Sequence, residues 1–145
     1  MASAAVVRKP VPSDVEYLLK TWGREHRRAL PRALPDRLFY PEFQKIMYSL
    51  VSRTDARVIC AAEDPNYIIG FVIGEVHADA QTAVIHFAYV RSPFRRAGFT
   101  RAALEDMGWR PGYEIVASHW SDYVARFDLK ALNIVYNPYI LYSVR

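Results

Sequence analysis

The hydrophobic pattern along residues 82–108 changes from the alternation of a strand to the spacing of a helix. Thr82 to Val90 is apolar at nearly every position, which is typical of a central strand covered on both faces. After a basic segment, apolar residues recur every three or four positions from Phe99, and Gly108 is suited to end a helix. Strict alternation predicts two faces for the strand, with Val84, His86, Ala88 and Val90 on one and Ala83, Ile85, Phe87 and Tyr89 on the other.

The same kind of pattern predicts the other elements. Ser13 and Glu16 form a Ser-x-x-Glu capping box at the start of a first helix, and Pro41 suits the first turn of a second helix. Further helices are expected from Phe99 and over residues 121–129, and strands over residues 4–9, 57–62, 67–76, 82–90, 113–118, 132–136 and 139–144. This order predicts one α/β (α+β) domain over residues 1–145, with a mixed, mostly antiparallel central sheet flanked by about four helices.

The composition is that of a globular protein, with 52% hydrophobic and 23% charged residues. The single cysteine, Cys60, excludes an internal disulfide, and its apolar neighbours in sequence favour a buried thiol in a reducing compartment. No apolar run approaches the roughly 20 residues that span a bilayer, and residues 1–7 are too short for a signal peptide. We therefore expect a soluble, cytoplasmic protein without a membrane partner.

The net charge of +4 is compatible with phosphate-bearing ligands and with nucleic acid, so it does not choose between them. A basic cluster over residues 24–32 lies at the end of the first predicted helix, where such charges usually form a solvated face that complements the helix dipole. Nucleic acid is therefore not the expected partner. The four histidines lack the spacing of a metal cluster, and no Gly-x-Ser-x-Gly or Walker sequence supports a hydrolase.

The basic segment before Phe99 has the features of an anion-binding site. The first N–H groups of a helix have no acceptor within the helix and carry the positive end of its dipole. Arg95 and Arg96 precede this helix start, and Gly98 lets an anion approach the backbone closely. These residues predict a phosphate cradle, and an ordinary basic turn without a ligand is the alternative.

The run from Val90 to Thr100, VRSPFRRAGFT, resembles the acetyl-CoA signature of the GNAT N-acetyltransferases. In that signature a strand ends and an Arg/Gln-x-x-Gly-x-Gly/Ala segment opens a helix. Arg95 and Gly98 match the pattern, whereas Thr100 stands where the family has Gly or Ala. The predicted order of elements is also similar to the GNAT fold, so the resemblance implies a GNAT-like domain with one splayed pair of parallel strands.

The resemblance further implies acetyl-CoA as a co-substrate, without a metal. Pantetheine would lie between the splayed strands against the backbone of residues 87–90, and the amides of residues 96–101 would hold the pyrophosphate. The implied reaction is direct transfer of the acetyl group to a primary amine, of a small molecule or a protein, in a ternary complex. The implied cofactor-binding residues are Phe87, Ala88, Tyr89, Val90, Arg95, Arg96, Ala97, Gly98, Phe99, Thr100 and Arg101.

Acetyl transfer to an amine needs a base for the amine and an acid for the leaving thiolate. By resemblance to some amine-acetylating members, His86 is the candidate base, although a lone His on an apolar strand is more often a hydrogen-bonded core residue. Glu75 and His77 are alternative bases that would act through water. Tyr123 is the candidate acid and Tyr136 an alternative, but neither lies in a recognisable motif.

A catalytically inactive binding or structural subunit with the GNAT fold is the alternative function. Thr100 and the absence of the family's C-terminal Tyr motif favour it. The short length and the hinge from Pro93 to Arg96 also resemble small GNAT-like proteins of tailed bacteriophages, some of which are virion components. This alternative fits a homo-oligomer or a larger assembly, located in the host cytoplasm or in a virion.

Overall fold

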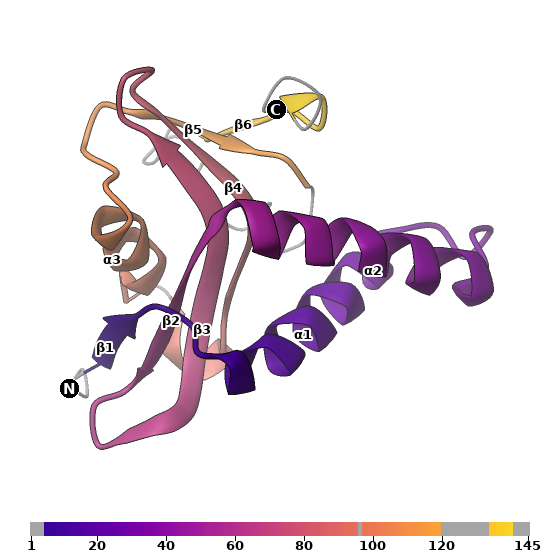
Figure 1. The fold of residues 1–145 in the computed structure, drawn as a ribbon, viewed down its shortest axis with the longest axis horizontal. Helices are drawn as coiled ribbons and strands as arrows, with labels where there is room; N and C mark the ends of the chain where they lie inside the picture. Colours follow the sequence, from indigo (N-terminus) through magenta and orange to yellow (C-terminus); the bar gives the residue numbers. More distant parts are fainter. Residues whose placement is uncertain (1–4, 96, 120–133, 141–145) are drawn as a thin grey trace.

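The computed structural model describes residues 5–95, 97–119 and 134–140. In chain order the elements are β1 (Ala5–Arg8), the 3₁₀ turn η1 (Pro12–Asp14), α1 (Val15–Arg28), α2 (Asp36–Arg53), β2 (Asp55–Ala61), β3 (Asp64–His77), β4 (Thr82–Val90), the 3₁₀ turn η2 (Ser92–Phe94), α3 (Phe99–Asp106), β5 (Glu114–Ala117) and β6 (Ile134–Tyr136). A six-stranded sheet lies at the centre, with α1 and α2 on one face and α3 on the other (Figure 1).

The strands lie side by side in chain order, from β1 at one edge to β6 at the other. Strands β1 to β4 pair antiparallel, whereas β5 is parallel to β4 and β6 is parallel to β5. The predicted mixed, mostly antiparallel sheet is confirmed. Helix α3 makes the crossover between the parallel strands β4 and β5, as a strand-helix-strand unit requires.

Each face of the sheet carries its own apolar core. On one face, Leu104 of α3 packs in a cluster with Ile85 and Ile115 from the strands. On the other face, Trp22 of α1 packs in a cluster with Phe87 of β4. Because both faces are buried, the central strands read as near-continuous apolar runs in the sequence.

The start of α1 differs from the predicted capping box. The Glu16 side chain forms a surface ion pair with a lysine one turn later and makes no cap contact with Ser13. The Asp14 carboxylate instead accepts hydrogen bonds from the Val11 N–H at 2.8 Å and from the Arg8 guanidinium at 2.7 Å. The hydrogen bond from Arg8 lowers the pKa of Asp14, so the carboxylate that orders this turn stays ionised.

Helix α2 begins at Asp36, earlier than predicted, so Pro41 lies inside the helix and not in its first turn. The reason is an aromatic cluster: the rings of Phe39 and Phe43 stack with centroids 5.1 Å apart, and both lie against His26 of α1. Burial of Phe39 extends the apolar face of the helix by one turn. This burial offsets the intrahelical hydrogen bond that proline cannot donate.

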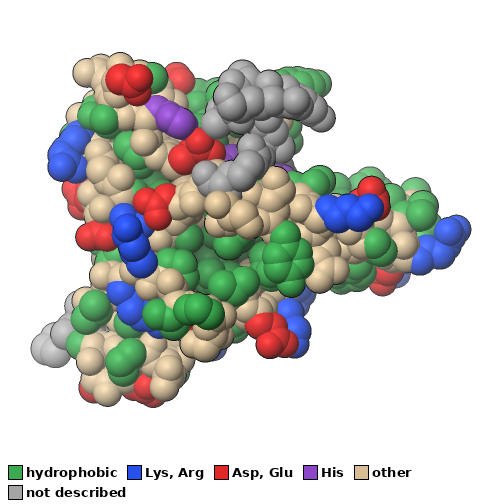
Figure 2. Space-filling view, viewed as in Figure 1, with side chains coloured by type: hydrophobic (Ala, Val, Ile, Leu, Met, Phe, Trp, Pro, Cys, Tyr) green, Lys and Arg blue, Asp and Glu red, His purple; other side chains and the backbone are tan. Residues whose placement is uncertain are grey.

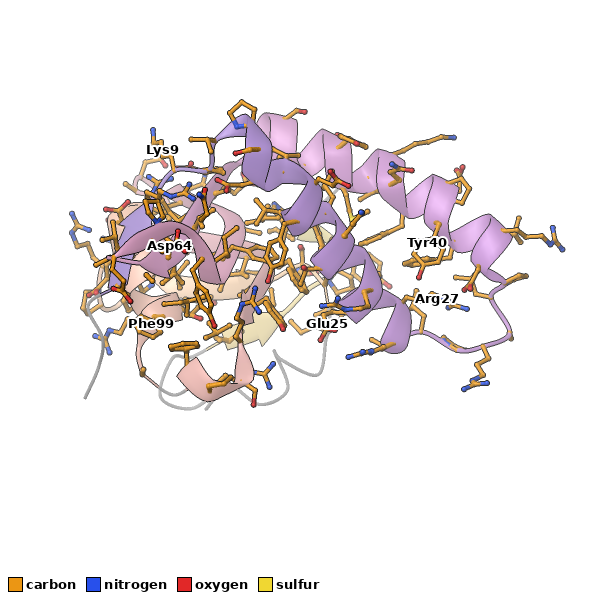
Figure 3. The ribbon with its side chains drawn as sticks, turned by 90° about the horizontal axis from the view of Figure 1, so that it is seen from below. Lys9, Glu25, Arg27, Tyr40, Asp64 and Phe99 are labelled. Carbon is orange, nitrogen blue, oxygen red and sulfur yellow. The ribbon has the colours of Figure 1, made fainter. Side chains whose placement is uncertain are left out.

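Helices α1 and α2 together form an arm that extends beyond the sheet (Figure 1). Figure 2 shows Lys and Arg side chains interspersed with Asp and Glu side chains along this arm. Arg27, near the free end in Figure 3, lies 2.7 Å from the Asp36 carboxylate, and Arg28 lies 3.0 Å from that of Glu25. The basic cluster of the sequence is thus partly neutralised within the arm.

Strand β4 contains a bulge, and the side chains that follow it lie on the opposite face of the sheet from the one predicted by strict alternation. Its pairing with β3 shifts by one residue between Ile73 and Gly74, which leaves His86 as an extra residue in β4. The predicted grouping of His86 with Ala88 and Val90 is therefore wrong, because one inserted residue moves every later side chain to the opposite face. The α3 face holds Ala83, Ile85, Ala88 and Val90, and the α1/α2 face holds Phe87 and Tyr89.

The C-terminal part also departs from the prediction. Strand β6 is present, but Tyr139 and Ile140 are not in a strand, so the strand predicted over residues 139–144 is wrong at these two positions. The helix predicted over residues 121–129 lies outside the described residues, in which three α-helices are found. None of these three helices combines the length and apolar character needed to cross a membrane.

Candidate active site

Strands β4 and β5 separate after Ile85. They are paired from Thr82–Glu114 to Ile85–Ala117, and the Ser118 N–H donates one more bond to the Ile85 carbonyl oxygen at 2.9 Å. Strand β4 continues to Val90 and, within the described residues, is paired over this part with β3 alone. Residues 86–90 therefore present a strand edge without a β5 partner, which confirms the predicted splayed pair.

Val90 and Ala88 direct backbone polar groups to this open edge. The Arg91 N–H donates to the Ile69 carbonyl oxygen of β3 at 2.8 Å, so residue 91 faces β3. The Val90 carbonyl oxygen instead accepts a hydrogen bond from Arg95 Nε at 2.8 Å, on the side away from β3. Because backbone groups alternate along a strand, Ala88 presents its N–H and C=O to the same open side. An extended ligand with amide groups can pair there as an added strand would.

The segment that follows β4 leads into the start of α3, at which Gly98 is the N-cap. Gly98 has φ of +80°, in the left-handed region that favours glycine, and a Cβ at this position would meet nothing within 4 Å. Ala97 and Gly98 are exposed, whereas Thr100 is only 6% exposed and therefore does not fill this open space. Figure 3 shows Phe99, the first residue of α3, across the sheet from the α1/α2 arm. The space beside the helix N-terminus can accept an anion.

Two of the predicted arginines remain near this helix start. The Arg95 guanidinium lies 5.9 Å from the ring centroid of Tyr89, and that of Arg101 lies 5.4 Å from the ring centroid of Trp109. Such contacts orient a guanidinium without removing its charge. Arg96 lies outside the described residues.

A chain of hydrogen bonds lies where β4 and β5 separate. His86 Nδ1 is 2.7 Å from Ser118 Oγ, and His86 Nε2 is 2.8 Å from Glu75 Oε2. Glu75 Oε1 is 2.9 Å from His77 Nε2, and Ser118 Oγ is 2.9 Å from His119 Nδ1. The chain thus joins the His77 side chain, which is 41% exposed, to the His86 side chain, which is 1% exposed.

The bulge in β4 gives His86 these partners. The ring of His119 lies edge-on to Trp22 and Phe43, at centroid distances of 5.6 and 6.0 Å, and both belong to the α1/α2 core. His86, linked to His119 through Ser118, therefore lies on this face of the sheet. Figure 2 shows histidine next to acidic side chains on the surface near the end of the sheet, away from the arm.

His119 is uncharged at neutral pH. Burial, together with smaller effects of the nearby His26 and His86, lowers its pKa to about 3. A neutral imidazole carries one N–H donor and one acceptor nitrogen, so His119 can accept a proton on one nitrogen while releasing one from the other.

The structure brings together Glu75, His77 and His86 of the predicted catalytic residues, whose roles stay predictions. Tyr123 lies outside the described residues. Tyr136 pairs with Ala117, a residue of the α3-side core, and cross-strand partners share a face. The Tyr136 side chain therefore lies on the face opposite to His86.

Sequence reasoning missed Ser118 and His119, which directly follow β5. A signal was present, because these two polar residues end the apolar run of the predicted strand over residues 113–118. Their meeting with His86 depends on the register that pairs Ile85 with Ala117. In the part of the chain that the structure describes, no group of three or more His, Cys, Asp or Glu side chains is arranged to hold a metal ion.

A known protein family matches much of the chain. The model of the acetyltransferase (GNAT) family matches residues 17–107. Two structures of the aminoglycoside N-acetyltransferase AAC(6′)-Iy, one in complex with CoA and one with the bisubstrate analogue CoA-S-monomethyl-acetylneamine, align with TM-scores of 0.50 and 0.51, each at 14% identity. These alignments cover 92% and 91% of this chain and 90% and 91% of the other.

An acetyltransferase of the GNAT family from Staphylococcus aureus MU50 aligns with a TM-score of 0.48 and 13% identity over 72% of this chain. The aligned part spans 64% of the staphylococcal chain, less than two thirds of its length. No curated protein sequence matches the chain significantly. At such low identities the structural likeness concerns the fold.

Proposed function

The chain belongs to the acetyltransferase (GNAT) family, as the match over residues 17–107 shows, and from this premise we propose that it transfers an acetyl group from acetyl-CoA to a primary amine. The observation that carries the proposal is the open edge of β4, which leads through η2 to the exposed N-cap of α3. This order suits a ligand that has amide groups at one end and a diphosphate at the other.

Acetyl-CoA has these two parts. Its pantetheine amides would pair with the backbone groups of Ala88 and Val90, and its pyrophosphate would accept hydrogen bonds from the first turn of α3 beside Gly98. Arg95 and Arg101 add positive charge near this point. The thioester would then lie where β4 and β5 separate, close to His86.

The proposed reaction is direct transfer in a ternary complex. The amine nitrogen loses a proton and attacks the thioester carbonyl carbon, and the tetrahedral intermediate then releases the CoA thiolate, which takes up a proton. Glu75 and His86, which lie 2.8 Å apart where β4 and β5 separate, are the acid–base pair that we propose for these proton transfers. A small-molecule amine is the acceptor we propose, because the similar AAC(6′)-Iy structure holds an analogue of acetylated neamine.

Isothermal titration with acetyl-CoA tests the binding step. We expect the wild type to bind and Gly98→Trp to weaken affinity at least tenfold, because the indole would occupy the open space beside the helix start. Gly112→Trp is the matched control, since Gly112 also has a positive φ, of +98°, and a Cβ there would also meet nothing within 4 Å, but it lies after α3. Absence of wild-type binding, or equal affinity in both variants, would refute the proposal.

Binding without turnover is the second candidate function. It is favoured by the environment of His86, whose side chain is 1% exposed and whose two ring nitrogens are both engaged. Release of the CoA thiol decides between the two functions, measured with acetyl-CoA and a panel of spermidine, neamine and a peptide with a free N-terminus. Amine-dependent release supports transfer, whereas tight binding without release supports a binding protein.

A further inference from the structure

The hydrogen-bond chain around His86 has a defined direction. With the Glu75 carboxylate accepting from both neighbours, His86 Nε2 and His77 Nε2 each carry a proton that they donate to it. In the tautomer that donates from Nε2, His86 Nδ1 carries a lone pair and accepts from the Ser118 hydroxyl. Ser118 Oγ also lies 3.5 Å from the Ile85 carbonyl oxygen, but its contact with His86 Nδ1 is much shorter, so we assign the single hydroxyl proton to the bond with His86. Ser118 Oγ then accepts from His119 Nδ1–H. Assigned from this network, the acceptor nitrogen of His119 is Nε2.

We propose that Ser118 and His119 extend the acid–base pair into a proton relay, in which His119 meets the acceptor amine and Ser118 passes its proton to His86. This inference rests on the proposed acetyl transfer. It assigns the contact with the amine to His119 and gives Ser118 a positioning role between the two imidazoles.

Burial explains why the relay does not begin at His86. The His86 side chain is 1% exposed, and its two ring nitrogens are already bonded to Ser118 and Glu75. His119, at the end of the hydrogen-bond chain, is only partly buried, whereas His86 is fully buried. Its Nδ1 is bonded to Ser118, and its ring packs against aromatic side chains of α1 and α2. An amine next to the separated strands therefore meets the chain at His119.

Because of its electrostatic surroundings, His119 is suited to passing a proton to Ser118 and does not retain the proton itself. With a pKa of about 3, lowered by burial and by His26 and His86, the ring stays neutral and so keeps one nitrogen with a lone pair. Among residues 5–95, 97–119 and 134–140, the titratable groups that face the relay are His26 from α1 and Glu75 and His77 from β3. Of these, the Glu75 carboxylate stabilises a proton that reaches His86.

The proton movements balance without another reactant. An ammonium N–H bond breaks as an N–H bond forms at His119 Nε2, and the Nδ1 proton of His119 moves to Ser118 Oγ. The hydroxyl proton of Ser118 moves to His86 Nδ1, which leaves His86 as an imidazolium ion paired with the Glu75 carboxylate. The Nε2 proton of His86 then moves to Glu75 Oε2, and Glu75, whose side chain is 15% exposed, releases it to solvent, which leaves a neutral His86 protonated on Nδ1. No electron is exchanged with a cofactor.

The tautomers of the histidines test the direction of the chain without any need for turnover. The protein has four histidines, so long-range ¹H–¹⁵N spectra of the labelled full-length chain separate their rings. At neutral pH we expect His119 with its proton on Nδ1 and His86 with its proton on Nε2. In Ser118→Ala the Nδ1 preference of His119 should disappear. A wild-type His119 protonated on Nε2 beside a neutral His86 would overturn the relay.

Kinetics test the role of Ser118 in transfer. With the amine that supports wild-type turnover, Ser118→Ala should lower kcat about 100-fold with little change in KM, since positioned proton transfer contributes at least this much. Ser118→Thr should recover most of the activity because it keeps the hydroxyl. Ser52→Ala is the control, because it removes a hydroxyl that donates to the Tyr48 carbonyl oxygen at an exposed position of α2.

The outcomes separate the two proposals. Wild-type kcat in Ser118→Ala overturns the relay and leaves acetyl transfer in place. A wild type that binds acetyl-CoA but acetylates no amine overturns the proposed transfer, and the relay fails with it.

Discussion

Gly74 allows β3 to approach the bulge in β4, and Gly74→Ala measures how strongly the fold depends on that approach. A Cβ at position 74 would overlap the Val84 carbonyl oxygen and lie 3.3 Å from the Ile85 Cα. Both are backbone atoms, so neither can rotate away, and the two strands must move apart. Overpacking of this kind typically costs about 1–3 kcal/mol, and a forced backbone shift places Gly74→Ala near about 3 kcal/mol.

Urea unfolding followed by circular dichroism measures this loss of stability. Gly74→Ala should lower the midpoint with little change in slope, because the surface exposed on unfolding is nearly the same. The strand shift should also move the imidazole ¹⁵N resonances of His86, whose bond to Ser118 crosses the neighbouring strands. A loss below about 1 kcal/mol with unchanged His86 resonances would refute the reasoning, because an ordinary substitution costs that much.

Two further substitutions test other parts of the structure. Gly23→Ala in α1 should raise stability by about 0.5–1 kcal/mol, because a Cβ there would lie 3.6 Å from Met47 Cε in ordinary contact and alanine favours the helix. A decrease in the urea midpoint would contradict this packing. His119 has a pKa of about 3 in the folded protein and near 6.5 in the unfolded chain. Between these pH values the unfolded chain binds more protons, so the stability of the fold should fall as the pH falls from about 6.5 to about 3. His119→Phe should flatten part of that fall, measured by urea unfolding at neutral pH and about pH 4; an unchanged pH dependence would show that His119 does not titrate as described.

Most of the sheet could be predicted from local patterns, but the faces of β4 could not. An alternation shows which face is buried when one face is polar, whereas β4 is apolar on both faces and carries no such information. The insertion of His86 therefore left no trace in the hydrophobic pattern. Gly74 was the one local sign, since glycine within a strand often marks a bulge or a close approach.

The two ends of the helical arm show how tertiary contacts override local signals. The Ser13–Glu16 capping box was a sound local pattern, yet the Asp14 carboxylate bonded to Arg8 orders this turn. Pro41 suggested a helix start, yet burial of Phe39 moves the start of α2 to Asp36. In both cases a partner distant in sequence decides the outcome.

The candidate site was predictable where it depends on consecutive residues and not where it depends on strand register. The hinge before α3 is continuous in sequence, so Gly98 could be identified by itself. His86 and Ser118, in contrast, are 32 residues apart and meet because Ile85 pairs with Ala117. No single-sequence pattern fixes such a register.

The bulge and the separation of β4 from β5 occur at the same place, and this coincidence divides the site into two parts. Up to Ile85, β4 pairs with β5; the next residue is the inserted His86, whose side chain meets Glu75 and Ser118. Beyond it, backbone groups of β4 are open to a ligand that also reaches Gly98. Proton transfer therefore depends on side chains at the bulge, and cofactor binding depends on backbone after it. Substitution of Ser118 should accordingly change turnover without changing acetyl-CoA affinity, whereas substitution of Gly98 should change affinity without altering the histidine tautomers.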